Sequence, residues 1–137
     1  MAESFSKEER AAMKARAKEL KEQSTKADGL KAVLAAIGEM TGDEKAIAER
    51  IHEIVIESAP ELAPKTYYGM PGWAKDGKVL VFFQSATKFK TRYSTLGFND
   101  NATVDVGSMW PVAYAINALT LANEKAIVAL ITKAVAS

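Results

Sequence analysis

An Asp-Gly pair, Asp76-Gly77, predicts a β-hairpin because it separates two runs of aromatic, β-branched and polar residues. The runs are Trp73–Lys75 and Lys78–Gln84. Apolar residues occupy both faces of the second run: Val79, Val81 and Phe83 on one, Leu80 and Phe82 on the other. A strand with two apolar faces is covered on both sides, so we expect it to be central in an antiparallel sheet.

Further strands are expected around this hairpin. Tyr67–Trp73 has the composition of a strand, but Pro71 cannot donate a ladder hydrogen bond and predicts an interruption there. In Lys88–Tyr93 basic residues alternate with Phe89, Thr91 and Tyr93, which favours a strand with one basic face. Trp110–Ile116 is the last expected strand, within an uncharged segment from Val106 to Asn123 that we interpret as a buried strand followed by a helix start.

Helices are expected before the sheet. Ser6 and Glu9 form a capping-box pattern and predict a helix from Lys7 to about Gln23. A short amphipathic helix follows, with an apolar face at Leu30, Val33, Leu34 and Ile37. Thr41 and Glu44 repeat the capping box and open a longer helix that ends before Pro60. The expected core face of this helix is Ile47, Ile51, Ile54, Val55 and Ser58, and we expect an earlier helix to cover Ile56.

A closing helix, capped by Thr120 or Asn123, completes the expected elements. Its expected buried stripe is Leu121, Ile127, Val128, Leu130, Ile131 and Val135. Helices, then strands, then a helix indicate an α+β fold with an antiparallel sheet of about five strands packed against helices. We divide the chain into an N-terminal helical extension, residues 1–40, and an α+β domain, residues 41–137.

Composition limits the classes of function. Hydrophobic residues are 48% and charged residues 26%, as in a soluble globular protein. The absence of cysteine excludes disulfides, thiolate zinc sites and a cysteine nucleophile. Polar residues interrupt the uncharged segment and the N-terminus has no apolar run, so we expect no membrane span and a cytoplasmic location. A net charge of +1 does not favour a nucleic-acid partner.

One candidate site is an acidic ridge on the helix that follows Thr41. Glu49, Glu53 and Glu57 are spaced by four residues, and His52 completes a Glu-x-x-His pattern of the kind that supplies two ligands in di-iron bundles. Such a site needs a second pair, and this chain has one histidine. We expect His52 to point away from the core. The alternative interpretation is a solvated helix face.

A second candidate site combines basic and aromatic residues. Its members are Tyr68, Met70, Trp73, Lys90, Arg92 and Trp110. They could form a pocket for a small anionic molecule. A related possibility is a basic platform that binds phosphate or stacks single-stranded bases, made of Lys88, Lys90 and Arg92 near Tyr67, Tyr68, Trp73 and Trp110. In the alternative interpretation the aromatic side chains fill the core and the basic ones are solvated. No catalytic residue is identified, so we expect a protein that is not an enzyme.

Three stretches carry a resemblance to a known family: Tyr68–Pro71, Lys75–Gln84 and Lys88–Tyr93. Together they resemble the YdhG-like family, a group of domains of unknown function that is sometimes grouped with frataxin-like iron chaperones, and more closely an actinobacterial branch of it. The resemblance covers roughly residues 43–135 and implies an α+β domain. It also implies iron handling on an acidic helical surface, here Asp43, Glu44, Glu49, Glu53 and Glu57. Many relatives carry a histidine where this sequence has Lys90, which counts against a metal role at the sheet.

Three hypotheses follow. The first is a cytosolic binding protein of the YdhG-like type, an iron-handling accessory that uses the acidic helix, with iron as the one cofactor considered. The second is a binding module for a small anionic ligand at the basic and aromatic face. The third is a structural role in which the N-terminal helix joins two copies of the chain.

Overall fold

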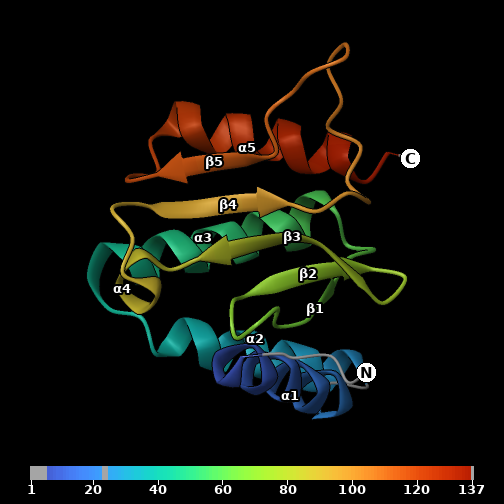
Figure 1. Ribbon diagram of the computed structural model, residues 1–137. Helices are drawn as coiled ribbons and strands as arrows, with labels where there is room; N and C mark the ends of the chain where they lie inside the picture. Colours follow the sequence, from blue (N-terminus) through green and yellow to red (C-terminus); the bar gives the residue numbers. More distant parts are fainter. Residues whose placement is uncertain (1–5, 23–24, 137) are drawn as a thin grey trace.

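The computed structural model describes residues 6–22 and 25–136, with the backbone alone for residues 20–22. Within these residues five helices and one five-stranded antiparallel sheet form an α+β fold, which confirms the predicted fold class. Figure 1 shows α3 and α5 behind the sheet and α1 and α2 below it. None of the described helices is long and apolar enough to cross a membrane.

The strands follow one another across the sheet in sequence order. They are β1 (Ala63–Pro64), β2 (Gly72–Lys75), β3 (Lys78–Gln84), β4 (Ser94–Phe98) and β5 (Ala113–Ile116), each antiparallel to the next. The predicted hairpin is confirmed, since Lys75 pairs with Lys78 across Asp76 and Gly77, both at positive φ. β3 is central, as predicted, with β2 on one side and β4 on the other.

The helices are α1 (Lys7–Glu22), α2 (Lys26–Gly38), α3 (Gly42–Ser58), α4 (Ala86–Phe89) and α5 (Leu121–Ala134). The capping box before α1 is formed, because the Glu9 N–H donates to Ser6 Oγ and the Ser6 N–H donates to Glu9 Oε1. Thr120 caps α5 by accepting from the Asn123 N–H at 3.1 Å. The second predicted capping box is wrong, since the Thr41 side chain accepts no capping hydrogen bond.

The core lies between the sheet and helices α2, α3 and α5. The expected face of α3 is confirmed, with Ile47, Ile51, Ile54 and Val55 buried. They belong to one cluster with Trp73, Leu80, Phe83, Leu96, Ile127 and Ile131. Val33 and Ile37 of α2 join the same cluster, so α2 shares its core with the residues that follow it.

The predicted strand at Lys88–Tyr93 is wrong. Ser85 Oγ accepts from the Lys88 N–H at 3.1 Å and caps the short helix α4, which takes the place of the start of this strand. Lys90 then adopts the left-handed conformation, with φ 56°, and the chain re-enters the sheet at β4. A local side-chain cap here outweighs the alternation of basic and aromatic residues.

Several predicted apolar contacts are also wrong. Ile56 is 47% exposed, so no helix covers it. Leu121 and Val128 are 71% and 39% exposed and lie outside the buried stripe of α5. The uncharged segment is not a buried strand at its start, because its exposed loop contains Val106, Met109 and Val112. This loop projects at the top of Figure 1, and β5 begins only at Ala113.

Candidate functional site

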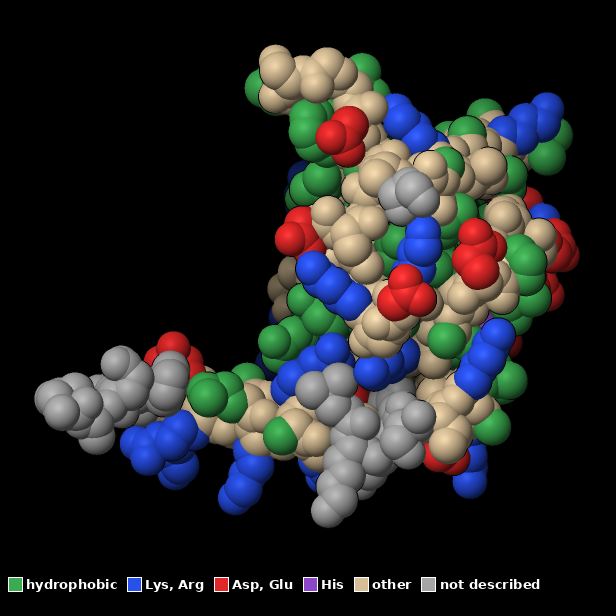
Figure 2. Space-filling model, turned by 90° about the vertical axis from the view of Figure 1, so that its right-hand side faces the viewer, with side chains coloured by type: hydrophobic (Ala, Val, Ile, Leu, Met, Phe, Trp, Pro, Cys, Tyr) green, Lys and Arg blue, Asp and Glu red, His purple; other side chains and the backbone are tan. Residues whose placement is uncertain are grey.

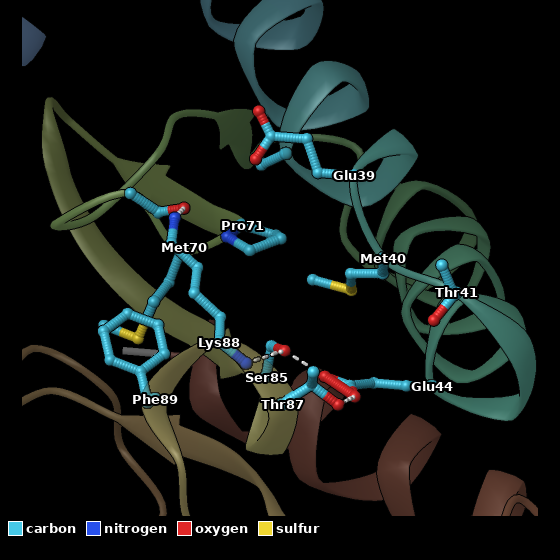
Figure 3. A pocket seen from close by; sticks show the side chains of 12 residues that line it. Glu39, Met40, Thr41, Glu44, Met70, Pro71, Ser85, Thr87, Lys88 and Phe89 are labelled. Carbon is cyan, nitrogen blue, oxygen red and sulfur yellow. Dashed lines mark hydrogen bonds between the residues drawn. The ribbon is translucent and has the colours of Figure 1, made fainter.

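A cavity of about 220 Å³ lies where the α2–α3 corner meets the turn before β2 and the helix α4 (Figure 3). Its apolar wall comprises Met40, Met70, Pro71 and Phe89. Its polar side chains are Glu39, Thr41, Glu44, Ser85, Thr87 and Lys88. We call this space the Met70 cavity. An apolar wall with a few convergent polar groups is the usual composition of a small-molecule site.

A tight turn presents Met70 to the cavity. The Tyr67 N–H donates to Met70 O at 2.8 Å, and the Met70 N–H donates to Tyr67 O at 3.0 Å. The two residues between them, Tyr68 and Gly69, have φ 52° and 80°, as a two-residue hairpin turn requires. Gly69 takes this conformation without the steric cost of a Cβ atom. The Met70 side chain is 7% exposed and lies beside Pro71 in Figure 3.

Glu44 joins α3 to α4 at the floor of the cavity. Its Oε1 accepts from Ser85 Oγ, and its Oε2 accepts from Thr87 Oγ1 at 2.7 Å. Figure 3 shows the carboxylate turned toward these two hydroxyls. The Glu44 carboxylate therefore bonds to α4 instead of making the reciprocal bond of the predicted capping box to the Thr41 N–H. Glu44 is therefore a structural acceptor rather than an unpaired charge.

Lys88 extends along the open side of the cavity. Its Nζ donates to Gly69 O at 3.2 Å and lies 5.7 Å from the centroid of the Phe89 ring. The Lys88 side chain is exposed, and it donates to the neutral carbonyl of Gly69 rather than to a carboxylate. A lysine ammonium has three donors, so this cation can bind an anion that enters the cavity.

The structure does not bring together the six residues predicted for an anionic ligand. Met70 lines the Met70 cavity, and Tyr68 is 50% exposed on the outer side of the turn. Trp73 is fully buried in the core, and Trp110 packs partly buried against it. Lys90 and Arg92 are exposed in the segment that follows α4. Trp73 and Trp110 thus fit the alternative interpretation, in which the aromatic side chains are structural.

The expectation that His52 points away from the core is wrong. Its side chain is 8% exposed, and its Nδ1 accepts from Trp73 Nε1 at 3.1 Å. Burial lowers the pKa of His52, and the neighbouring Glu53 only partly opposes this effect. The predicted core face was too narrow, because Ala48 and Ala59, which it did not include, are buried beside His52 as well.

The four predicted metal ligands do not form a metal site. Glu49 and Glu57 are exposed, Glu53 Oε1 bonds to Arg50 at 3.1 Å, and His52 Nδ1 is occupied by the Trp73 indole. In the part of the chain that the structure describes, no three histidine or acidic side chains are placed to hold a metal ion. The ridge fits the alternative interpretation of a solvated helix face.

Comparisons of the chain with family models, with curated proteins and with solved structures find no match. The resemblance to the YdhG-like family therefore stays a prediction. The class of ligand is therefore inferred from the geometry of the Met70 cavity.

Proposed function

We propose that the protein binds a small carboxylic acid with a short apolar body in the Met70 cavity. The observation that carries this proposal is the position of the Lys88 ammonium, on a neutral carbonyl at the edge of an apolar cavity. The proposal keeps the predicted class of ligand, a small anion, and moves its site from the sheet face to this cavity.

The apolar wall favours a hydrocarbon group of modest size. Met40 and Met70 contribute unbranched, polarisable side chains that adapt to irregular shapes, and Pro71 and Phe89 complete the wall. At about 220 Å³ the cavity is smaller than the 300 Å³ or so at which drug-sized sites begin. The ligand is therefore an acid with only a few carbon atoms.

The position of the Lys88 ammonium favours an acid over an amine. Both oxygens of Glu44 already accept from Ser85 and Thr87, so a cationic ligand would have to share them with these hydroxyls. Lys88 would exchange the Gly69 carbonyl for a carboxylate, whose full negative charge attracts the ammonium more strongly than a neutral carbonyl does. The exposed Glu39 at the rim disfavours ligands with a second negative charge.

We propose that the protein binds this ligand without catalysing a reaction on it. We also propose a cytoplasmic location for the protein, as its composition predicts. Iron handling is the weaker proposal, because two of the four residues it would use, His52 and Glu53, already have partners within the chain.

The proposal is tested by titrating the protein with valerate while its NMR signals are recorded. We expect saturable shifts at the cavity residues, and weaker binding of valeramide and pentylamine, which lack the carboxylate. Lys88→Gln should weaken valerate binding about tenfold or more, the equivalent of one charge-assisted hydrogen bond of about 1.5 kcal/mol or above. Lys90→Gln is the matched control, because Lys90 follows α4 but does not line the cavity. Equal binding of valerate and valeramide, or an equal loss in both variants, would refute the proposal.

A further inference from the structure

A buried carboxylate from α1 occupies the outer side of the turn that presents Met70. Glu19 Oε1 accepts from the Tyr68 N–H at 2.9 Å. Glu19 Oε2 accepts from the Gly69 N–H at 2.8 Å and from Thr66 Oγ1 at 2.5 Å. Two successive N–H groups of a turn and one hydroxyl thus converge on the two oxygens of one carboxylate. Such a concavity of backbone N–H groups binds anions.

Arg16 closes this site from the helix side. Its NH1 donates to Glu19 Oε1 at 2.9 Å and to Thr66 O at 3.1 Å. Its guanidinium lies 5.1 Å and 5.3 Å from the ring centroids of Tyr67 and Tyr68. Burial alone raises the pKa of Glu19, but the hydrogen bonds from Thr66, Gly69, Arg16 and Tyr68 together outweigh it and hold the pKa below its ordinary value. The site therefore holds an ionised carboxylate.

From Lys7 to Lys18, α1 contributes little apolar packing to its attachment. From Lys7 to Lys18 every side chain is exposed except Arg16, which is half-buried, and Met13 is 52% exposed. Figure 2 shows the start of α1 projecting from the body of the protein at the lower left, with lysine and arginine side chains along it. Because little apolar area is buried in this range, the hydrophobic effect contributes little to holding the helix against the rest of the protein. Within Lys7–Glu19, Arg16 and Glu19 attach the helix to the turn by hydrogen bonds.

We propose that the turn Thr66–Gly69 is a carboxylate-binding site whose resident occupant is Glu19, and that an external carboxylate binds there when α1 detaches. The donors recognise the two oxygens of the carboxylate and not the chain that carries it. The ligand class is therefore a carboxylate, either of a small acid or of an acidic side chain in a peptide. This site is distinct from the Met70 cavity, although Gly69 contributes to both: its N–H to Glu19 and its C=O to Lys88.

Chemical rescue tests the proposal in the full chain. Glu19→Ala removes the resident carboxylate, and acetate is then titrated while the amide signals of Tyr68 and Gly69 are followed by NMR. We expect saturable shifts with a Kd on the order of 10 mM, the weak affinity of a small ion held by a few charge-assisted hydrogen bonds. Acetamide, or sodium chloride at the same ionic strength, should not reproduce them. Glu8→Ala, at an exposed position of the same helix, is the matched control: its Tyr68 amide should not respond to acetate, because Glu19 still holds it and Tyr68 does not line the Met70 cavity.

A second arm distinguishes the two sources of the carboxylate. A synthetic peptide of residues 7–22 is added to the Glu19→Ala protein. Its effect on the Tyr68 and Gly69 amide signals is compared with that of the same peptide carrying Glu19→Gln. A response to acetate supports the site and a small acid as sufficient ligand, whereas a response only to the peptide with Glu19 supports the site and a peptide source. If neither the Tyr68 nor the Gly69 amide signal shifts on addition of acetate or of either peptide, the proposal is overturned. Should Glu19→Ala lose its native circular dichroism, Glu19→Gln, which keeps the length of the side chain but has no carboxylate, takes its place. Because Lys88 is unchanged in these variants, valerate binding in the Met70 cavity is measured separately and succeeds or fails independently.

Discussion

Replacing His52 separates two effects of this buried side chain on stability, a hydrogen bond and a titration. Its Nδ1 accepts from the indole N–H of Trp73, which is fully buried. His52→Gln retains a side-chain oxygen that can accept this hydrogen bond but has no charge change near neutral pH. His52→Leu loses both the acceptor and the titration.

The loss in free energy of unfolding expected for His52→Leu follows from the burial of Trp73. Without an acceptor the indole N–H stays buried and unpaired, and such a group costs about 1–3 kcal/mol. We expect His52→Leu to be less stable than His52→Gln by this amount at pH 7.5. For a chain of 137 residues this corresponds to a Tm lower by roughly 3–5 °C for each kcal/mol.

The pH dependence has a definite sign. The folded-state pKa of His52 lies below its ordinary value of 6.5 because burial disfavours the charged imidazolium. The unfolded chain therefore binds more protons than the folded chain between the two pKa values. The stabilisation is complete above about pH 6.5. It is lost progressively as the pH falls through the folded-state pKa. Because the chain has one histidine, both variants should lose this dependence.

Urea unfolding followed by tryptophan fluorescence, at several pH values from 5 to 8, measures both effects. The wild type should lose stability toward pH 5 more steeply than either variant. If the wild type and His52→Gln show the same slope, His52 is not buried as a neutral side chain. If the leucine and glutamine variants are equally stable, the hydrogen bond to Trp73 contributes nothing.

Two other predictions concern packing. Gly29→Ala would place a Cβ atom 2.0 Å from Pro64 O, where α2 approaches β1, and should destabilise the fold by about 1–3 kcal/mol; Gly38→Ala, with open space around the new atom, is the control for thermal unfolding and should be neutral or slightly stabilising. Ile131→Ala should cost about 2–5 kcal/mol in urea unfolding because Ile131 is fully buried, whereas Leu121→Ala, at a position 71% exposed, should change stability by less than about 0.5 kcal/mol. Equal effects within either pair would contradict the assigned packing.

The central hairpin of the sheet and the long helices were predictable because their signals are local. Asp76 and Gly77 fix a two-residue hairpin by their conformational preferences alone. Ile47, Ile51 and Ile54 of α3 recur at helical spacing and are buried, whereas Ile56 lies off this face and is exposed. Such patterns depend on neighbours in sequence and need no knowledge of distant segments.

The candidate site was much less predictable because it depends on contacts between distant segments. Met70 was identified, but Glu44 was assigned to a capping box, since nothing in the sequence shows that Ser85 and Thr87 hold its carboxylate. Lys88 was placed on a strand that a serine cap converts into a helix. The role of Glu19 was missed altogether, because its helix has the composition of a solvated one and its partners lie about fifty residues away.

The most direct test of the central claim is an intermolecular NOE measurement on the valerate complex with labelled methionine methyl groups. If valerate binds in the Met70 cavity, NOEs are expected from its alkyl protons to the methyl groups of Met40 and Met70, both of which line the cavity. At the same ligand concentration these NOEs should weaken strongly in Lys88→Gln. NOEs to the exposed Tyr68 ring, with none to Met40 or Met70, would contradict the account and place the ligand outside the cavity.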